Sequence, residues 1–132
     1  MTDLADLVDP VELFVYGTLL RGERNHGYLD GCAFLGETAT APGFALVDLG
    51  GHPGMIKAAG GCVAGELYRV GGEALRAIDQ LEQHPDVYWR TKVRLVDRRG
   101  VQTYLLRPEL ARGRPRVPGG DWRAHRVATG EA

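Results

Sequence analysis

The sequence predicts a small α+β domain in which short strands form a barrel-like or strongly curved sheet. About six short runs rich in β-favouring residues are separated by turns that contain glycine or proline. A single segment, residues 73–83, has the apolar spacing of a long helix. The 132 residues contain no internal repeat and no linker between two halves, which indicates one domain. A doubly wound sheet, which alternates strands with helices, does not fit this order.

Strands are expected where apolar and β-branched residues run between turn signals, at residues 13–16, 32–40, 44–47, 62–70, 87–96 and 101–106. Residues 97–100 supply a hairpin turn between the last two strands. Gly65, inside a strand, indicates a bend or a close approach of another part of the chain. Residues 49–55 are rich in glycine and broken by a proline, so we expect a loop there.

Helices are expected in two places. Residues 23–29 are predicted to form about two helical turns, and the longer helix begins at Glu73 and is stopped by Pro85. The chain is divided into a loosely held lead-in at residues 1–12, a barrel domain at 13–106 and a polar C-terminal extension at 107–132. Apart from residues 120–123, we expect the extension to be mobile.

Composition narrows the function classes. The chain is 44% apolar and 25% charged, with a formal net charge of −1, which argues against a nucleic-acid partner or a membrane-surface partner. No apolar run is long enough for a membrane span, and the acidic start is not that of a secretory signal. Cys32 and Cys62 lack metal-ligand or redox spacing, so we expect reduced thiols and a cytoplasmic location.

The sequence also limits the kinds of catalysis. It contains no serine, which excludes a serine nucleophile, and neither cysteine has a neighbouring base. The four histidines show no ligand spacing, so neither a metal nor another cofactor is predicted. Gly17 and Gly22 have the gap of a phosphate-binding Walker loop, but Glu23 stands where that loop requires lysine.

The loop from Gly17 to Gly22 follows a buried strand and is a candidate ligand site. Its two glycines flank a short stretch of backbone that can aim several N–H groups at one place, as a carboxylate requires. The alternative is an ordinary turn between a strand and a helix.

A carboxylate lies on the wrong face of the long helix. The apolar residues of this helix fall within one arc: Ala74, Leu75, Ile78 and Leu81. Glu82 follows Ile78 by four residues and falls inside the same arc. Partial burial raises the pKa of a carboxyl and suits it to proton transfer. The alternative is that the helix frays and that Glu82 turns into water.

Several pieces of sequence occur in a fixed order: Phe14-Val15-Tyr16-Gly17-Thr18-Leu19 with Arg21-Gly22 and Asn25-His26, then Gly65-Glu66-Leu67-Tyr68, Asp79-Gln80-Leu81-Glu82 and Tyr88-Trp89-Arg90-Thr91. This set resembles the gamma-glutamylcyclotransferase family, and within it the gamma-glutamylamine cyclotransferase branch. The resemblance runs from about residue 13 to 106, and residues 120–123 also match. Gln83 follows Glu82 where many relatives have glycine, which leaves the identity of the substrate open.

The resemblance implies a compact mixed barrel with flanking helices and a specific reaction. The α-amine of a small γ-glutamyl substrate attacks its own γ-carbonyl, an acyl transfer within the substrate that releases 5-oxoproline and an amine. Glu82 stands at the position of the family's acid/base, with a pKa expected to be raised but below neutrality. The resemblance assigns substrate binding to Tyr16, Gly17, Thr18 and Leu19 and adds two aromatic pocket positions, Tyr88 and Tyr104.

A different class of function uses the same residues. A catalytically silent barrel would bind an amino acid or another small carboxylate through the loop and release no product. The carboxylate at Glu82 favours the enzyme, because a site that only binds anions gains nothing from a buried negative charge.

Overall fold

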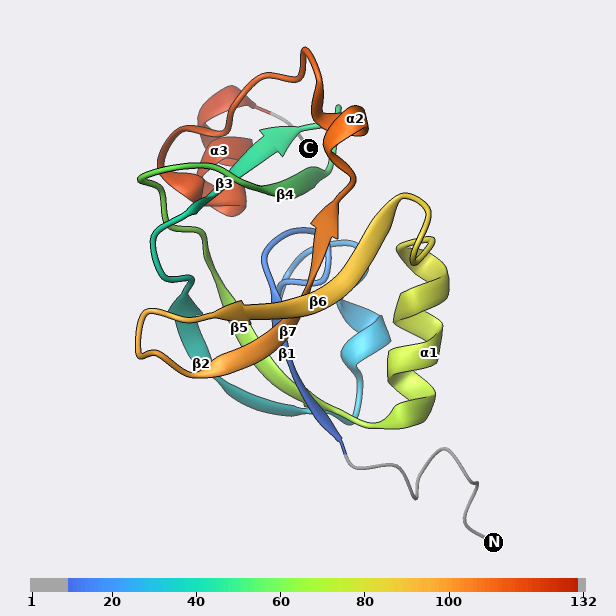
Figure 1. Cartoon of the computed structure of the whole chain (residues 1–132). Helices are drawn as coiled ribbons and strands as arrows, with labels where there is room; N and C mark the ends of the chain where they lie inside the picture. Colours follow the sequence, from blue (N-terminus) through green and yellow to red (C-terminus); the bar gives the residue numbers. More distant parts are fainter. Residues whose placement is uncertain (1–9, 131–132) are drawn as a thin grey trace, which may run out of the picture.

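The fold is a mixed seven-stranded sheet with a few short helices at its edges (Figure 1). The computed structural model describes residues 10–130, so most of the predicted lead-in lies outside the described residues. The strands are β1 (Val11–Val15), β2 (Ala33–Ala39), β3 (Phe44–Asp48), β4 (Pro53–Lys57), β5 (Ala64–Val70), β6 (Tyr88–Arg94) and β7 (Gly100–Leu106). The helical elements are η2 (His26–Leu29), α1 (Gly72–Leu81), α2 (Pro108–Ala111), η3 (Pro118–Gly120) and α3 (Trp122–Thr129).

The sheet has the order β2-β5-β1-β7-β4-β3, and β6 also pairs with β7. β1 is antiparallel to β5 but parallel to β7, and β7 is in turn parallel to β4. β1 therefore lies inside the sheet, and its last three residues are buried on both faces, as is typical of an interior strand. The loop that follows β1 leaves the sheet from this buried position.

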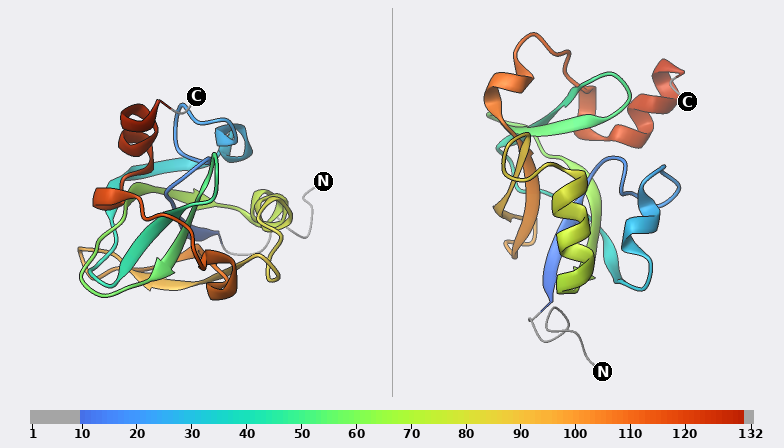
Figure 2. Two further views of the ribbon diagram at one scale, coloured as in Figure 1. Left: turned by 90° about the horizontal axis from the view of Figure 1, so that it is seen from above. Right: turned by 90° about the vertical axis from the view of Figure 1, so that its right-hand side faces the viewer.

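The predicted α+β class with a mixed sheet is confirmed, but the barrel does not close along a continuous ladder. The strands curve around a shared interior (Figure 2, left). β2 meets the segment after β6 at one isolated bridge, Thr40 with Leu95, and the Ala41 N–H donates to the Arg94 carbonyl at 2.9 Å. A curved open sheet describes the molecule better than a regular barrel does.

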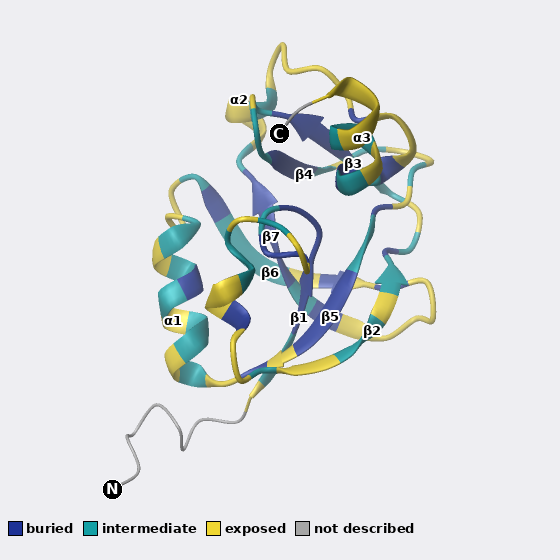
Figure 3. Ribbon diagram, turned by 180° about the vertical axis from the view of Figure 1, so that it is seen from behind, coloured by how far each residue is buried: buried dark blue, intermediate teal, exposed yellow. Residues whose placement is uncertain are grey.

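Side chains of β1 alternate between two apolar clusters, as the two-residue period of a strand dictates. Leu13 and Val15 pack in one cluster, which also contains Ile78 of α1. Phe14 packs in the other, together with Trp122 of α3. Figure 3 shows the strands that supply these clusters largely as buried, and it shows α1 with one covered and one exposed side. The amphipathic helix predicted at residues 73–83 is thus present as Gly72–Leu81.

Two local predictions were wrong. Residues 53–55, predicted as the end of a loop, instead begin strand β4. Pro53 is tolerated as its first residue, and β4 gains partners on both sides, β3 and β7. Residues 23–29 form a single 3₁₀ turn, His26–Leu29, instead of two helical turns. Hydrogen bonds within the preceding loop, such as Asn25 N–H to the Thr18 carbonyl, occupy the backbone that a longer helix would need.

Much of the polar C-terminal extension packs against the sheet instead of forming the mobile segment that we expected. Arg116 bridges to Val47 of β3, and Val117 is buried. Within residues 120–123, which we excepted, Trp122 is only 1% exposed. Asp121 caps α3 by accepting the Ala124 N–H at 3.0 Å. None of the helices within residues 10–130 is both long and apolar enough to cross a membrane.

Replacing Trp122 tests whether the extension belongs to the core. Because the indole is buried, Trp122→Ala is expected to lower the free energy of unfolding by about 3–5 kcal/mol in urea denaturation. Val127 lies on the same helix but is 79% exposed, so Val127→Ala is expected to change stability by less than about 0.5 kcal/mol. Equal losses in the two variants would contradict this packing.

Candidate active site

A cavity of about 220 Å³ opens where β1 ends, between the following loop, the end of α1 and the start of β4. All seven residues singled out in the sequence line it: Tyr16, Gly17, Thr18, Leu19, Glu82, Tyr88 and Tyr104. They come from four parts of the chain, and the fold brings them to one place. Their roles toward a substrate remain predictions.

Glu82 is the residue directly after α1 and serves as its C-cap, so the helix is intact up to this residue. Its backbone N–H donates to the Ile78 carbonyl at 2.9 Å. The side chain is half-buried, and within the described residues its carboxylate makes no hydrogen bond or ion pair. Desolvation by burial raises the pKa of Glu82 to about 7, near neutrality rather than clearly below it.

A second carboxylate fixes the end of the same helix. Asp79 accepts hydrogen bonds from Arg90 Nε at 2.9 Å and from the Tyr104 hydroxyl at 2.5 Å. These partners lie on β6 and β7, so Asp79 joins α1 to both strands. Burial acts to raise the pKa of Asp79, but the hydrogen bonds from Arg90 and Tyr104 outweigh it and leave the pKa below the usual value. Two carboxylates three residues apart therefore have opposite environments.

The loop after β1 offers backbone N–H groups to the cavity. Within residues 10–130, the backbone N–H groups of Gly17, Thr18 and Leu19 donate no hydrogen bond, and all three residues line the cavity. The loop is held by other bonds: Leu20 N–H to the Gly17 carbonyl at 3.1 Å, and Asn25 Nδ2 to Thr18 Oγ1 at 3.0 Å. Three free amides in one short stretch suit an anionic group of a ligand.

Gly17 is required by a close contact. A Cβ on this residue would lie 2.6 Å from Cγ of Pro53, so the ring of β4's first residue rests on the loop. Gly22, by contrast, has a φ of +83°, which favours glycine at the other end of the loop.

The three tyrosines wall the cavity, and their hydroxyls are engaged in the framework. Tyr16 donates to the Tyr104 carbonyl at 2.7 Å, and Tyr88 donates to the Pro53 carbonyl at 2.8 Å. Tyr104 donates to Asp79. Burial raises the pKa of all three, and the nearby charge of Glu82 raises each further. They stay protonated, and their rings define the shape of the site.

Sequence reasoning missed several cavity residues. Arg24 and His52 line its mouth, and Arg24 Nη1 donates to the Gly51 carbonyl at 3.2 Å. Desolvation lowers the pKa of His52, and Arg24 lowers it further, so its imidazole is neutral at pH 7. No local pattern marks these two residues. Arg24 reaches the cavity from the loop after β1, and the approach of β4, a strand that was not predicted, brings His52 of the preceding loop there.

Comparison with known proteins places the chain in a family. The family profile described as "Gamma-glutamyl cyclotransferase, AIG2-like" matches residues 13–124. A putative gamma-glutamylcyclotransferase of Vibrio cholerae is 37% identical over 110 residues, which cover 83% of this chain and 93% of that protein. The gamma-glutamylaminecyclotransferase of Rattus norvegicus is 40% identical over 92 residues, covering 63% of this chain and 62% of that protein.

The structural comparison agrees with the sequence comparison. The crystal structure of a uropathogenic E. coli-specific protein matches with a TM-score of 0.78 at 26% identity, covering 95% of this chain and 99% of that chain. The fold and the profile together define a small gamma-glutamylcyclotransferase-like domain. The chain belongs to the gamma-glutamylcyclotransferase family, in its AIG2-like form, and the resemblance stated from the sequence is confirmed.

The raised pKa of Glu82 predicts a specific dependence of stability on pH. Between pH 4.5 and about 7, the folded protein keeps a proton on Glu82 that the unfolded chain has released. The contribution of this group to the free energy of unfolding therefore falls as the pH rises through that range. The difference between the two pKa values corresponds to about 3 kcal/mol of unfolding free energy, and this contribution is lost fully above pH 7.

Glu82→Gln removes this penalty. In urea denaturation the variant is expected to be more stable than wild type by up to about 3 kcal/mol at pH 8, and equal within about 0.5 kcal/mol at pH 4. Glu73→Gln, at an exposed position in the same helix, controls for the loss of a carboxylate. An effect of Glu82→Gln that is the same at both pH values would show that Glu82 is not desolvated.

Proposed function

We propose that the protein is a gamma-glutamylcyclotransferase, in which a γ-glutamyl amide is cleaved by its own α-amine to give 5-oxoproline and a free amine. The observation that carries this proposal is an unpaired, desolvated carboxylate that shares a small cavity with three unbonded backbone N–H groups. The carboxylate is suited to transfer protons, and the N–H groups are suited to bind the carboxylate of the glutamyl group.

Glu82 is the acid/base in this proposal. Its ionised carboxylate accepts a proton from the α-ammonium, and the neutral amine then attacks the γ-carbonyl carbon to form the ring C–N bond. Glu82 delivers the proton to the departing nitrogen as the original C–N bond breaks. The remaining extra proton of the ring nitrogen passes to the released amine, which is an ammonium at neutral pH. A pKa near 7 suits both steps, because the group must accept and donate in one turnover.

The loop and the tyrosines prepare the substrate for cyclisation. The N–H groups of Gly17, Thr18 and Leu19 hold the α-carboxylate, which fixes one end of the glutamyl chain. The rings of Tyr16, Tyr88 and Tyr104 confine the rest, so that amine and carbonyl meet. Closure of a five-membered ring is intramolecular, and holding the chain in an attacking conformation supplies much of the rate. The reaction needs no enzyme nucleophile, which agrees with the absence of serine.

Similarity to enzymes named for γ-glutamyl and γ-glutamylamine substrates supports a small-molecule γ-glutamyl substrate. A cytoplasmic site of action and the assignment of individual residues belong to the same proposal. The silent-barrel alternative explains the free amides equally well. It does not explain Glu82, since a binder of carboxylates is weakened by a negative charge in its cavity.

Measurement of 5-oxoproline release from a panel of γ-glutamyl amines and γ-glutamyl dipeptides tests the function. Glu82→Gln is expected to lower kcat by at least about 10²-fold, because the amide can neither accept nor deliver the proton. Glu73→Gln serves as the matched control and keeps wild-type turnover. Binding of 5-oxoproline, measured by calorimetry, is expected to survive in Glu82→Gln and shows that the cavity is intact. A wild-type protein that binds glutamate or 5-oxoproline but turns over nothing would establish the silent barrel.

The pH profile of the wild-type enzyme should report the same group. Since the base must be ionised, kcat/KM is expected to rise about tenfold per pH unit below pH 7 and to level off above it. Initial rates between pH 5 and 8.5 on one substrate give the profile. A profile that is flat across pH 7 would contradict the role of Glu82. The same rise below pH 7 in the residual activity of Glu82→Gln would also contradict it.

A further inference from the structure

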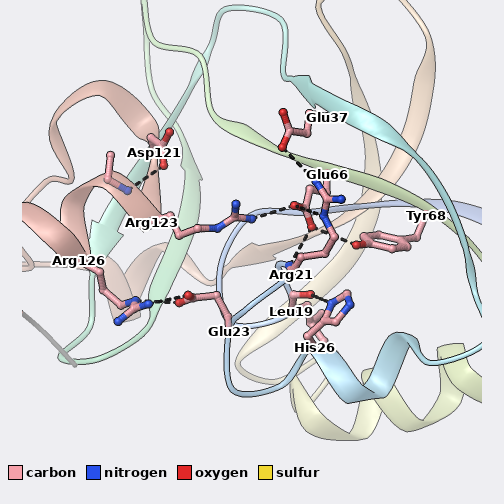
Figure 4. Close-up of polar contacts among 11 residues, drawn as sticks. Leu19, Arg21, Glu23, His26, Glu37, Glu66, Tyr68, Asp121, Arg123 and Arg126 are labelled. Carbon is pink, nitrogen blue, oxygen red and sulfur yellow. Dashed lines mark hydrogen bonds and ion pairs between the residues drawn. The ribbon is translucent and has the colours of Figure 1, made fainter.

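The proposed reaction leaves two parts of the family-like pattern without a role. Arg21-Gly22 and Gly65-Glu66-Leu67-Tyr68 lie outside the chemistry, as does the segment around Arg123. All three meet beside the loop that follows β1, where Arg21 and Arg123 both point toward Glu66 (Figure 4), and none of them lines the candidate active-site cavity. Residues 17–19 of this loop line the cavity, whereas the charged side chains that follow, Arg21 and Glu23, contact β5 and α3.

Glu66 is the first anchor of the loop. Its side chain is 1% exposed and accepts hydrogen bonds from Arg21 N–H at 3.0 Å, Arg21 Nε at 3.2 Å and Arg123 Nη2 at 2.8 Å. The Tyr68 hydroxyl also donates to it, at 3.1 Å. Burial acts to raise the pKa of Glu66, but these hydrogen bonds outweigh it and keep the carboxylate ionised. The loop backbone at Arg21 is therefore tied to β5 and, through Arg123, to α3.

Glu23 and Arg126 form the second anchor. Arg126 Nε and Nη2 donate to the two Glu23 carboxylate oxygens at 2.8 and 2.6 Å, a bidentate geometry. The Glu23 side chain is only 6% exposed and that of Arg126 24%, so the pair is largely out of water. Arg123 and Arg126 are three residues apart and share one face of α3.

α3 is itself fixed to the rest of the protein, so it is able to hold the loop. Trp122 is buried in the second apolar cluster, and His125 Nε2 lies 2.9 Å from Oδ2 of Asp48 on β3. Both views in Figure 2 show α3 on the same side of the molecule as the loop after β1. The free amides of Gly17 to Leu19 precede Arg21 and Glu23 by only a few residues, so the anchors and the amides belong to one short loop.

We propose that Arg123 and Arg126 of α3 are positioning residues, which act through Glu66 and Glu23 to hold the loop's N–H groups in the geometry that binds the substrate carboxylate. α3 then belongs to the working active site although it does not line its cavity. This inference rests on the proposed function for its kinetic effect. The physical claim, that α3 fixes the loop, stands independently of turnover.

A charge-exchange cycle on the second anchor tests the proposal. Glu23→Arg and Arg126→Glu each bring like charges together and are expected to raise KM at least tenfold with a smaller change in kcat. The double variant restores the pair and is expected to recover most of the loss. The apparent pKa near 7 in kcat/KM stays in place in all three, since Glu82 is untouched. The same exchange in the exposed Glu12–Arg99 pair, at 2.9 Å and remote from the loop, is the matched control.

Amide hydrogen exchange at Leu20, Arg21 and Glu23, the loop residues whose N–H groups are hydrogen-bonded, provides a readout that does not need activity. The single variants are expected to speed exchange of the loop at least tenfold, and the double variant to restore it, while the control pair leaves it unchanged. If the loop responds in this way but wild type releases no 5-oxoproline, α3 fixes the loop and the proposed function fails. Single variants with unchanged loop exchange and a KM within twofold of wild type would overturn the proposal, as would a double variant that recovers nothing.

Discussion

The attachment of the end of α1 to the sheet is the contact on which the candidate site depends. Asp79 receives hydrogen bonds from Arg90 of β6 and Tyr104 of β7, so three elements meet at one carboxylate. Arg90 pairs with Asp79, whereas Glu82 has no ion-pair partner in the described chain and lines the cavity. One helix end therefore carries a paired carboxylate and a desolvated one, a separation of roles that acid/base sites commonly need.

If Glu82 acts as proposed, this arrangement opposes stability to function at one residue. An unpaired carboxylate in a cavity walled by tyrosines destabilises the folded protein when ionised, and the rings that desolvate it are themselves held by hydrogen bonds to the framework. The same desolvation brings the pKa of Glu82 close to neutrality. In the proposed reaction, the energetic cost and the chemical usefulness of Glu82 thus have one physical cause.

The loop after β1 shows how a short segment is held at more than one place. Pro53 packs on Gly17 beside the cavity, and the carboxylates of Glu66 and Glu23 face the arginines of α3. Free backbone amides are useful only when they converge. Internal hydrogen bonds such as Leu20 N–H to the Gly17 carbonyl shape this loop, and its contacts with β4, β5 and α3 fix its position. In this view the C-terminal extension completes the domain rather than following it.

The sequence by itself determined the features that depend on local spacing. The helical period put Glu82 on the apolar side of α1, the strand-then-glycine pattern marked the loop from Gly17, and the ordered motifs identified the family. Only the tertiary structure decided which distant residues meet. β4 begins at Pro53 and has the sequence of a turn, but it pairs with β3 and β7. Glu23 contacts Arg126, which lies 103 residues later in the chain. Such contacts leave no periodic signal, because they are set by sheet order and packing rather than by neighbours along the chain.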